Sequence, residues 1–235
     1  MNASTRSRIF IAGLYGSAAV LLLIVLSTLT SFPLRWEWLF FGVAFGVFQS
    51  LAVEVNDRLR ASPTVMIVMT AAVIFGRDSA AIGAATIVIF GAVTPIDVHQ
   101  RRWFQPISNA GQFVLSAAVA GAVIAVALPD GDLTTADIGR VALGSAIAAV
   151  LYGAANLSLV TLAVRTVFRK RNLKPWSRMR PLVPSMALMG MLGGLLGATY
   201  LLVGPMTLPL LFSVFLVGHM AMRAVSQIRV AHEST

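Results

Sequence analysis

Apolar residues gather into eight segments along the chain, and short polar stretches separate them. A helix needs about 20 residues to cross about 30 Å of hydrocarbon. Six segments are long enough: Ile9–Thr30, Trp36–Val55, Gln105–Leu128, Ala136–Arg165, Pro181–Val203 and Met206–Arg223. The other two, Thr64–Gly76 and Ala80–Asp97, are separated only by three residues, and the first is short for a crossing. The pattern predicts an all-α polytopic transmembrane bundle, with about eight membrane segments or six plus a re-entrant hairpin at 64–97.

Composition and charge support a membrane location and predict an orientation. The chain of 235 residues is 57% hydrophobic and 11% charged, whereas about a quarter of the residues of a soluble domain are charged. With the N-terminus inside, every basic residue except Arg35, Arg77 and Arg140 falls on the cytoplasmic side. The net charge of +9 therefore reflects topology, and no nucleic-acid partner is expected. We expect a multi-pass membrane protein, with both termini cytoplasmic and the lipid bilayer as its surroundings.

Motifs for catalysis or metal binding are missing from the sequence. There is no cysteine, which excludes disulfides and thiolate-ligated metals. Asp97, His99 and His219 do not have the spacing of a known metal motif. Neither a P-loop nor a nucleophile elbow is present. We therefore expect no catalytic residues, no metal and no cofactor in these residues.

Polar side chains nevertheless follow one face of the segment that begins near residue 105. Gln105, Asn109, Gln112 and Ser116 are spaced four, three and four apart, so one helix face carries all of them. Gln49 and Asn156, on two other segments, are predicted to lie at a similar depth. Such side chains can satisfy one another across helices. The layer is either structural or a polar pocket for a small-molecule ligand of unknown identity.

The last segment continues as an amphipathic helix after Arg223, with Val225, Ile228 and His232 on a stripe typical of helix pairing. We divide the chain into a membrane domain, 1–223, and the start of a cytoplasmic output helix, 224–235, although a terminal tail would have the same pattern. Glycines recur four residues apart in three pairs, which is typical of close helix packing or of a dimer face. The pairs are Gly42/Gly46, Gly190/Gly194 and Gly193/Gly197.

Several of these features together resemble a known family. They are Arg101-Arg102-Trp103, then Asn109-Ala110-x-Gln112, Asn156, a basic loop with Trp176, and a helix that runs out through AHEST. This order resembles the membrane domain found ahead of bacterial HD-GYP cyclic-di-GMP phosphodiesterase domains, and sometimes ahead of GGDEF domains. The family usually has Phe before the Asn, and here Ser108 replaces it.

This resemblance implies a sensor of unknown stimulus, a homodimer, and a C-terminal helix that signals to a cytoplasmic enzyme outside these residues. The layout also resembles the substrate-binding subunit of energy-coupling-factor transporters. Two alternative functions therefore stay open, namely a substrate-binding transporter subunit and a structural subunit of a membrane complex.

Overall fold

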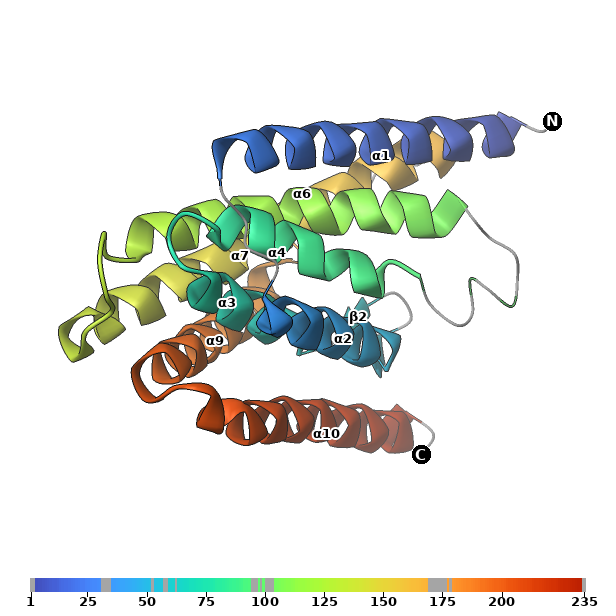
Figure 1. Ribbon diagram of the computed structural model, residues 1–235. Coiled ribbons are helices and arrows are strands. Elements are labelled where there is room, and N and C mark those ends of the chain that lie inside the picture. Colours follow the sequence, from blue (N-terminus) through green and yellow to red (C-terminus); the bar gives the residue numbers. More distant parts are fainter. Residues whose placement is uncertain are drawn as a thin grey trace.

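A computed structural model describes residues 3–30, 35–51, 53–56, 59–61, 63–93, 97, 99, 104–168, 177 and 179–233. This described part folds into a bundle of eight α-helices (Figure 1). They are α1 (Ala3–Leu29), α2 (Trp36–Ser50), α3 (Thr64–Phe75), α4 (Ala80–Ile87), α6 (Phe104–Ala127), α7 (Ile138–Phe168), α9 (Val183–Val203) and α10 (Leu208–Glu233). Four short 3-10 helices adjoin them: η1 (Val88–Gly91), η2 (Thr135–Asp137), η3 (Arg180–Leu182) and η4 (Pro205–Thr207).

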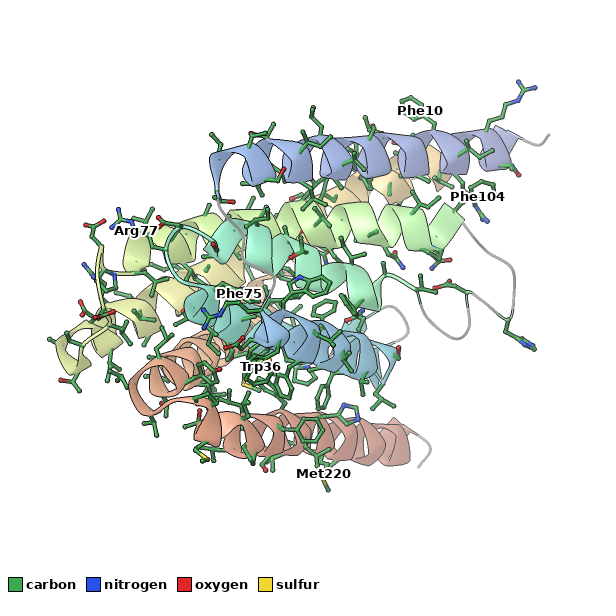
Figure 2. All side chains as sticks on the ribbon, in the orientation of Figure 1. Phe10, Trp36, Phe75, Arg77, Phe104 and Met220 are labelled. Carbon is green, nitrogen blue, oxygen red and sulfur yellow. The ribbon has the colours of Figure 1, made fainter. Side chains whose placement is uncertain are left out.

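Among the residues that the structure describes, four helices are long and apolar enough to cross a membrane, in keeping with a helical membrane bundle. These spans are Thr5–Leu29, Phe104–Ala127, Thr135–Val167 and Arg180–Val203. Three shorter apolar helices accompany them: Thr64–Phe75, Ala80–Gly91 and Pro205–Ala221. Large apolar side chains on the outside, such as Phe10 (63% exposed) and Met220 (61% exposed), point away from the bundle as lipid-facing residues do (Figure 2).

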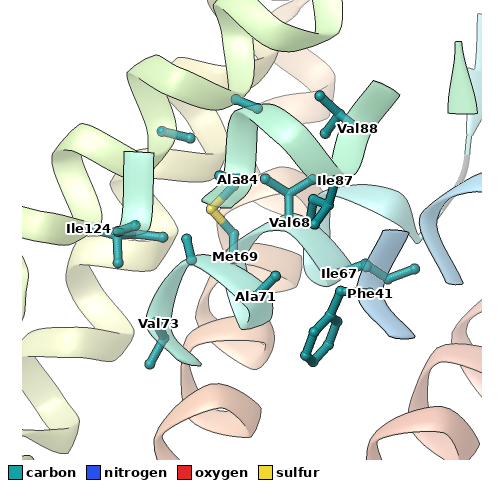
Figure 3. Packing of buried hydrophobic residues seen from close by; sticks show 14 of the residues in the cluster. Phe41, Ile67, Val68, Met69, Ala71, Val73, Ala84, Ile87, Val88 and Ile124 are labelled. Atoms are coloured by element: carbon teal, nitrogen blue, oxygen red, sulfur yellow. The ribbon is translucent and has the colours of Figure 1, made fainter. Parts of the chain in front are cut away.

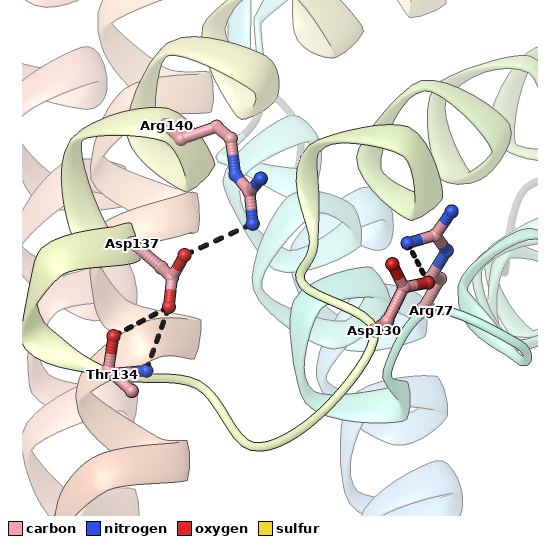
Figure 4. A network of polar contacts seen from close by, with 5 residues as sticks. All are labelled: Arg77, Asp130, Thr134, Asp137 and Arg140. Carbon is pink, nitrogen blue, oxygen red and sulfur yellow. Dashed lines mark hydrogen bonds and ion pairs between the residues drawn. The ribbon is translucent and has the colours of Figure 1, made fainter.

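The N- and C-termini lie on the same side of the bundle, and the α6–α7 and α9–α10 connections lie on the opposite side (Figure 1). The turn between α3 and α4 belongs to this second side, because Arg77 in that turn forms an ion pair with Asp130 in the α6–α7 connection (Figure 4). The same connection is ordered locally by a capping box, in which Asp137 accepts hydrogen bonds from the backbone N–H and the hydroxyl of Thr134. Helices α3 and α4 therefore meet at the level of the α6–α7 connection.

The predicted span Trp36–Val55 is wrong at its C-terminal end. Helix α2 stops at Ser50, and Val53–Asn56 forms strand β1, which pairs antiparallel with β2 (Leu59–Ala61). The apolar run continues past the end of the helix. Hydropathy depends on side chains alone, so it does not distinguish the helix from the strand that follows it. The bundle is thus all-α apart from this two-stranded hairpin.

Helix α3 occupies the centre of the bundle. Every residue from Met66 to Phe75 is buried, because α2, α4, α6, α7 and α9 all contact this helix. Apolar side chains therefore cover its whole circumference, as expected of a fully enclosed helix. Ile67, Val68 and Met69 of α3 pack with Ile87 of α4, and Phe41 of α2 closes the cluster (Figure 3).

The glycines of α9 allow it to approach two helices at once. Gly190 and Gly194 lie against Ser145 of α7. Gly193 lies against α3, where an added Cβ would stand 2.6 Å from the backbone oxygen of Met66, and Gly197 also lies against α3. Thr70 of α3 crosses this contact by donating a hydrogen bond of 3.0 Å to the Gly193 carbonyl. Of the two expectations for these glycines, packing within one chain is the one the structure shows.

Candidate functional site

The predicted polar stripe lies along α6, but its members enter different surroundings. Gln105 is exposed, Asn109 is half-buried, and Gln112 and Ser116 are buried. The Ser116 hydroxyl donates a hydrogen bond of 2.7 Å to the carbonyl of Gln112, one turn earlier in the same helix. That bond satisfies Ser116 without a neighbouring helix.

The two predicted partners of the stripe sit on helices that have different neighbours. Gln49 on α2 accepts a hydrogen bond of 3.3 Å from the hydroxyl of Thr64, at the start of α3. Asn156 on α7 is half-buried, and its Oδ1 is enclosed without a hydrogen-bond donor. Within the part of the chain that the structure describes, no hydrogen bond joins the side chains of two of the six predicted layer residues, and the Ser116 bond to the Gln112 backbone stays within one helix.

Helix α10 continues through the predicted domain boundary at 223 without a break. The side chains of the predicted output residues Val225, Ile228 and His232 lie outside what the structure describes. Nearer the bundle, α10 rests on Phe48 of α2. The rings of Phe215 and His219 have centroids 6.3 Å and 5.9 Å from that of Phe48. An aromatic contact thus connects the two helices.

A cavity of about 490 Å³ opens between α1, α6 and α7, with Ala81 of α4 at its edge. Alanine and leucine predominate in its lining, which makes it an apolar cavity within the helices assigned to the membrane. None of the six predicted layer residues contributes to it. Its lining is Leu22, Leu26, Ala81, Leu115, Ala118, Val119, Ala122, Ala155, Ser158 and Leu159.

A buried carboxylate forms a polar site that no sequence motif singles out. Glu37, in the first turn of α2, is only 3% exposed. Its Oε1 accepts a hydrogen bond of 2.9 Å from the hydroxyl of Tyr200 on α9, and the Arg35 guanidinium lies 3.3 Å from the same oxygen. Its Oε2 is enclosed and has no hydrogen-bond partner. The sequence could have pointed to Glu37, because an acidic residue within an apolar membrane segment is by default a candidate functional residue.

Comparison with known proteins assigns the bundle to a family. Residues 21–222 match MASE9, a family of membrane-associated sensor domains. Because the match covers most of the chain, the protein belongs to this family and is a membrane sensor domain. No curated protein and no solved structure matches the chain.

Proposed function

We propose that this domain receives a stimulus in the membrane and relays it through α10 to a cytoplasmic cyclic-di-GMP phosphodiesterase-type domain. In this proposal both termini are cytoplasmic, the membrane is a bacterial inner membrane, and the protein acts as a homodimer. Membership of the MASE9 family over residues 21–222 carries the sensor part of the proposal. The resemblance at Arg101–Gln112 and Asn156 supports the cyclic-di-GMP part.

The packing of α10 suits a relay. Phe48, β1 and η4 contact it, whereas α9 is held in close glycine contacts on two sides. The α9–α10 connection turns at Gly204, whose φ of +96° suits glycine better than any other residue. A helix with few buried contacts shifts at a lower free-energy cost than an enclosed one. Such a shift is an equilibrium between two conformations that differ in where α10 lies. The stimulus must bind one conformation more tightly than the other, since only a difference in affinity moves the equilibrium.

An alanine-insertion series after Glu233 tests the relay. Each inserted residue turns the following domain by about 100° relative to the bundle, and four residues restore the register to within about 40°. We expect cyclic-di-GMP hydrolysis in isolated membranes to change with one or two inserted alanines and to recover largely with four. The same insertions at Gly131, in the α6–α7 connection, serve as the control and should leave hydrolysis unchanged.

Two outcomes would overturn the relay. Hydrolysis that is indifferent to every insertion would show that α10 does not couple the two parts. Detection of the native protein, with an antibody to one of its loops, at a mass near 25.0 kDa would show that no catalytic domain is attached. A transporter or structural subunit would then be the function to test, by searching for a bound small molecule or partner subunit.

A further inference from the structure

We propose that Glu37 binds a proton from the outer side of the membrane and that this proton is the stimulus of the sensor. The inference rests on the proposed function for the orientation of the bundle and for the role of α10. It starts from a geometric fact, namely that one carboxylate oxygen of Glu37 has two donors and the other, equally buried, has none.

The unpartnered oxygen is the proton-binding atom. A buried polar atom without a partner costs about 1–3 kcal/mol, and more where charge is involved. A proton on Oε2 removes the charge that makes this enclosure unfavourable. Arg35 brings the site close to water, because its side chain is 48% exposed while it contacts the buried carboxylate.

The surroundings favour a proton over a metal ion. A hard cation such as Na⁺ or Ca²⁺ requires several oxygen ligands. Among the described residues, no group of three or more His, Cys, Asp or Glu side chains lies close enough to hold a metal ion. The hydroxyl of Tyr200 is the oxygen seen next to the carboxylate.

Few other titratable groups face Glu37. The elements packed on α2, namely α3, α4 and η1, carry no titratable side chain. From α9 only Tyr200 is titratable, and the α3–α4 turn carries the exposed Asp78 and Arg77, which is engaged by Asp130. His219 of α10 contacts Phe48, three turns further along α2. On α2 and the elements packed against it, Glu37 is therefore the buried acid, with Arg35 as its charged neighbour, and a residue-specific probe separates it from the exposed aspartates at this end of the bundle.

The site also has a direct connection to the output helix. Tyr200 lies one turn before Gly204, and the Gly204 N–H donates a hydrogen bond of 2.8 Å to the Tyr200 carbonyl. Protonation of Glu37 neutralises the acceptor of both Tyr200 and Arg35, so that α2 and the end of α9 are held together less strongly. The turn at Gly204 transmits this change to α10.

Carboxyl ¹³C NMR of the chain in lipid nanodiscs tests proton binding directly. The sequence contains three glutamates, Glu37, Glu54 and Glu233, so glutamate labelled at its side-chain carboxyl carbon gives three resonances. Glu54→Gln and Glu233→Gln assign the Glu37 resonance by elimination, without altering the site. We expect this resonance to shift on acidification from neutral pH, with a pH dependence that changes in Tyr200→Phe and is independent of NaCl at constant pH.

A Glu37 resonance that stays constant on acidification would overturn the inference. A pH dependence of this resonance that is the same in Tyr200→Phe would also overturn the inference, because Glu37 would then not interact with Tyr200. A resonance that shifts with NaCl at constant pH would identify a bound metal cation instead of a proton.

Spin labels test the connection to α10. The chain has no native cysteine, so Val47→Cys and Met220→Cys place labels only on α2 and α10, at side chains that are exposed. We expect the distance between the labels to shift on acidification and this shift to be lost in Glu37→Gln. A constant distance, or a shift that persists in Glu37→Gln, would overturn the inference. Neither result depends on the insertion series, so failure of the proton site and failure of the relay are distinguishable.

Discussion

At the scale of single residues, close packing and unpartnered polar atoms decide what each side chain can do. Gly193 of α9 has no room for a methyl group beside Met66, while Gly13 of α1 has nothing within 4 Å of where its Cβ would stand. Gln112 is buried, but no hydrogen bond of its side chain is seen in the described residues. Two helical glycines that look alike in sequence therefore differ in whether they can accept a larger residue.

We predict that Gly193→Ala destabilises the bundle by about 1–3 kcal/mol, because the added methyl group separates α9 from α3. The measurement is the thermal unfolding midpoint in detergent. Gly13→Ala is the matched control and should leave the midpoint unchanged or slightly higher, since alanine is the better helix former. Equal midpoints for wild type and Gly193→Ala would contradict the close contact.

We predict that replacing both Asn109 and Gln112 by Leu preserves membrane insertion and stability but changes the signalling output of the native protein. Neither side chain forms a hydrogen bond in the described part of the structure, so the substitutions break none, and leucine suits an apolar helix. A polar ligand pocket on α6, in contrast, would lose its recognition groups. Cyclic-di-GMP hydrolysis in isolated membranes is the measurement, and unchanged output would exclude such a pocket.

At the scale of elements, the bundle combines rigid and loosely held helices. Helix α3 is enclosed on all sides, and α9 is fixed by glycine contacts to α3 and α7. Helix α10 instead contributes few residues to the core, such as Leu211 and Phe215, and its ring contacts centre on Phe48 of α2. This contrast is the physical basis for assigning α10 as the moving part.

We predict that Phe48→Ala loosens α10 without disturbing the rest of the bundle. In lipid the loss is mainly of van der Waals packing, which we expect to amount to about 1 kcal/mol. The distance distribution between labels at Val47→Cys and Met220→Cys should broaden. Leu216→Ala, at a lipid-facing position of α10 that is 42% exposed, is the control, and a broadening of equal size there would argue against a specific role for Phe48.

At the scale of the whole molecule, the side of the membrane on which each connection lies decides how a stimulus reaches the sensor. The ion pair of Arg77 with Asp130 places the α3–α4 turn beside the α6–α7 connection. Glu37 and the Gly204 turn are assigned to that same outer side in the proposed topology. The stimulus site and the start of the output helix would then face the same compartment.

We predict that a membrane-impermeant thiol reagent applied to intact cells labels Asp78→Cys and Gly131→Cys but not Gln105→Cys. All three positions are exposed, and the absence of native cysteine removes background labelling. Gln105→Cys should become reactive once the membrane is permeabilised. If Asp78→Cys does not react from outside, the result would support a re-entrant hairpin at 64–97 instead of two crossings.

The sequence by itself determined the class of the protein, because hydropathy and charge act locally and are read directly from residue order. The predicted helical bundle, the long spans such as Gln105–Leu128, and the location of both chain ends on one side required no tertiary contacts. The family resemblance at Arg101–Gln112 and Asn156 likewise pointed to a membrane sensor.

Only the tertiary structure decided which polar residues meet. Gln49 bonds to Thr64 instead of another carboxamide, and Glu37 finds Tyr200, a residue 163 positions away in sequence. Helix periodicity defines the face on which a side chain lies, but the neighbour of that face depends on how all helices pack at once. The end of α2 at Ser50 was hidden for the same reason, since an apolar residue satisfies hydropathy equally well in a helix and in a strand.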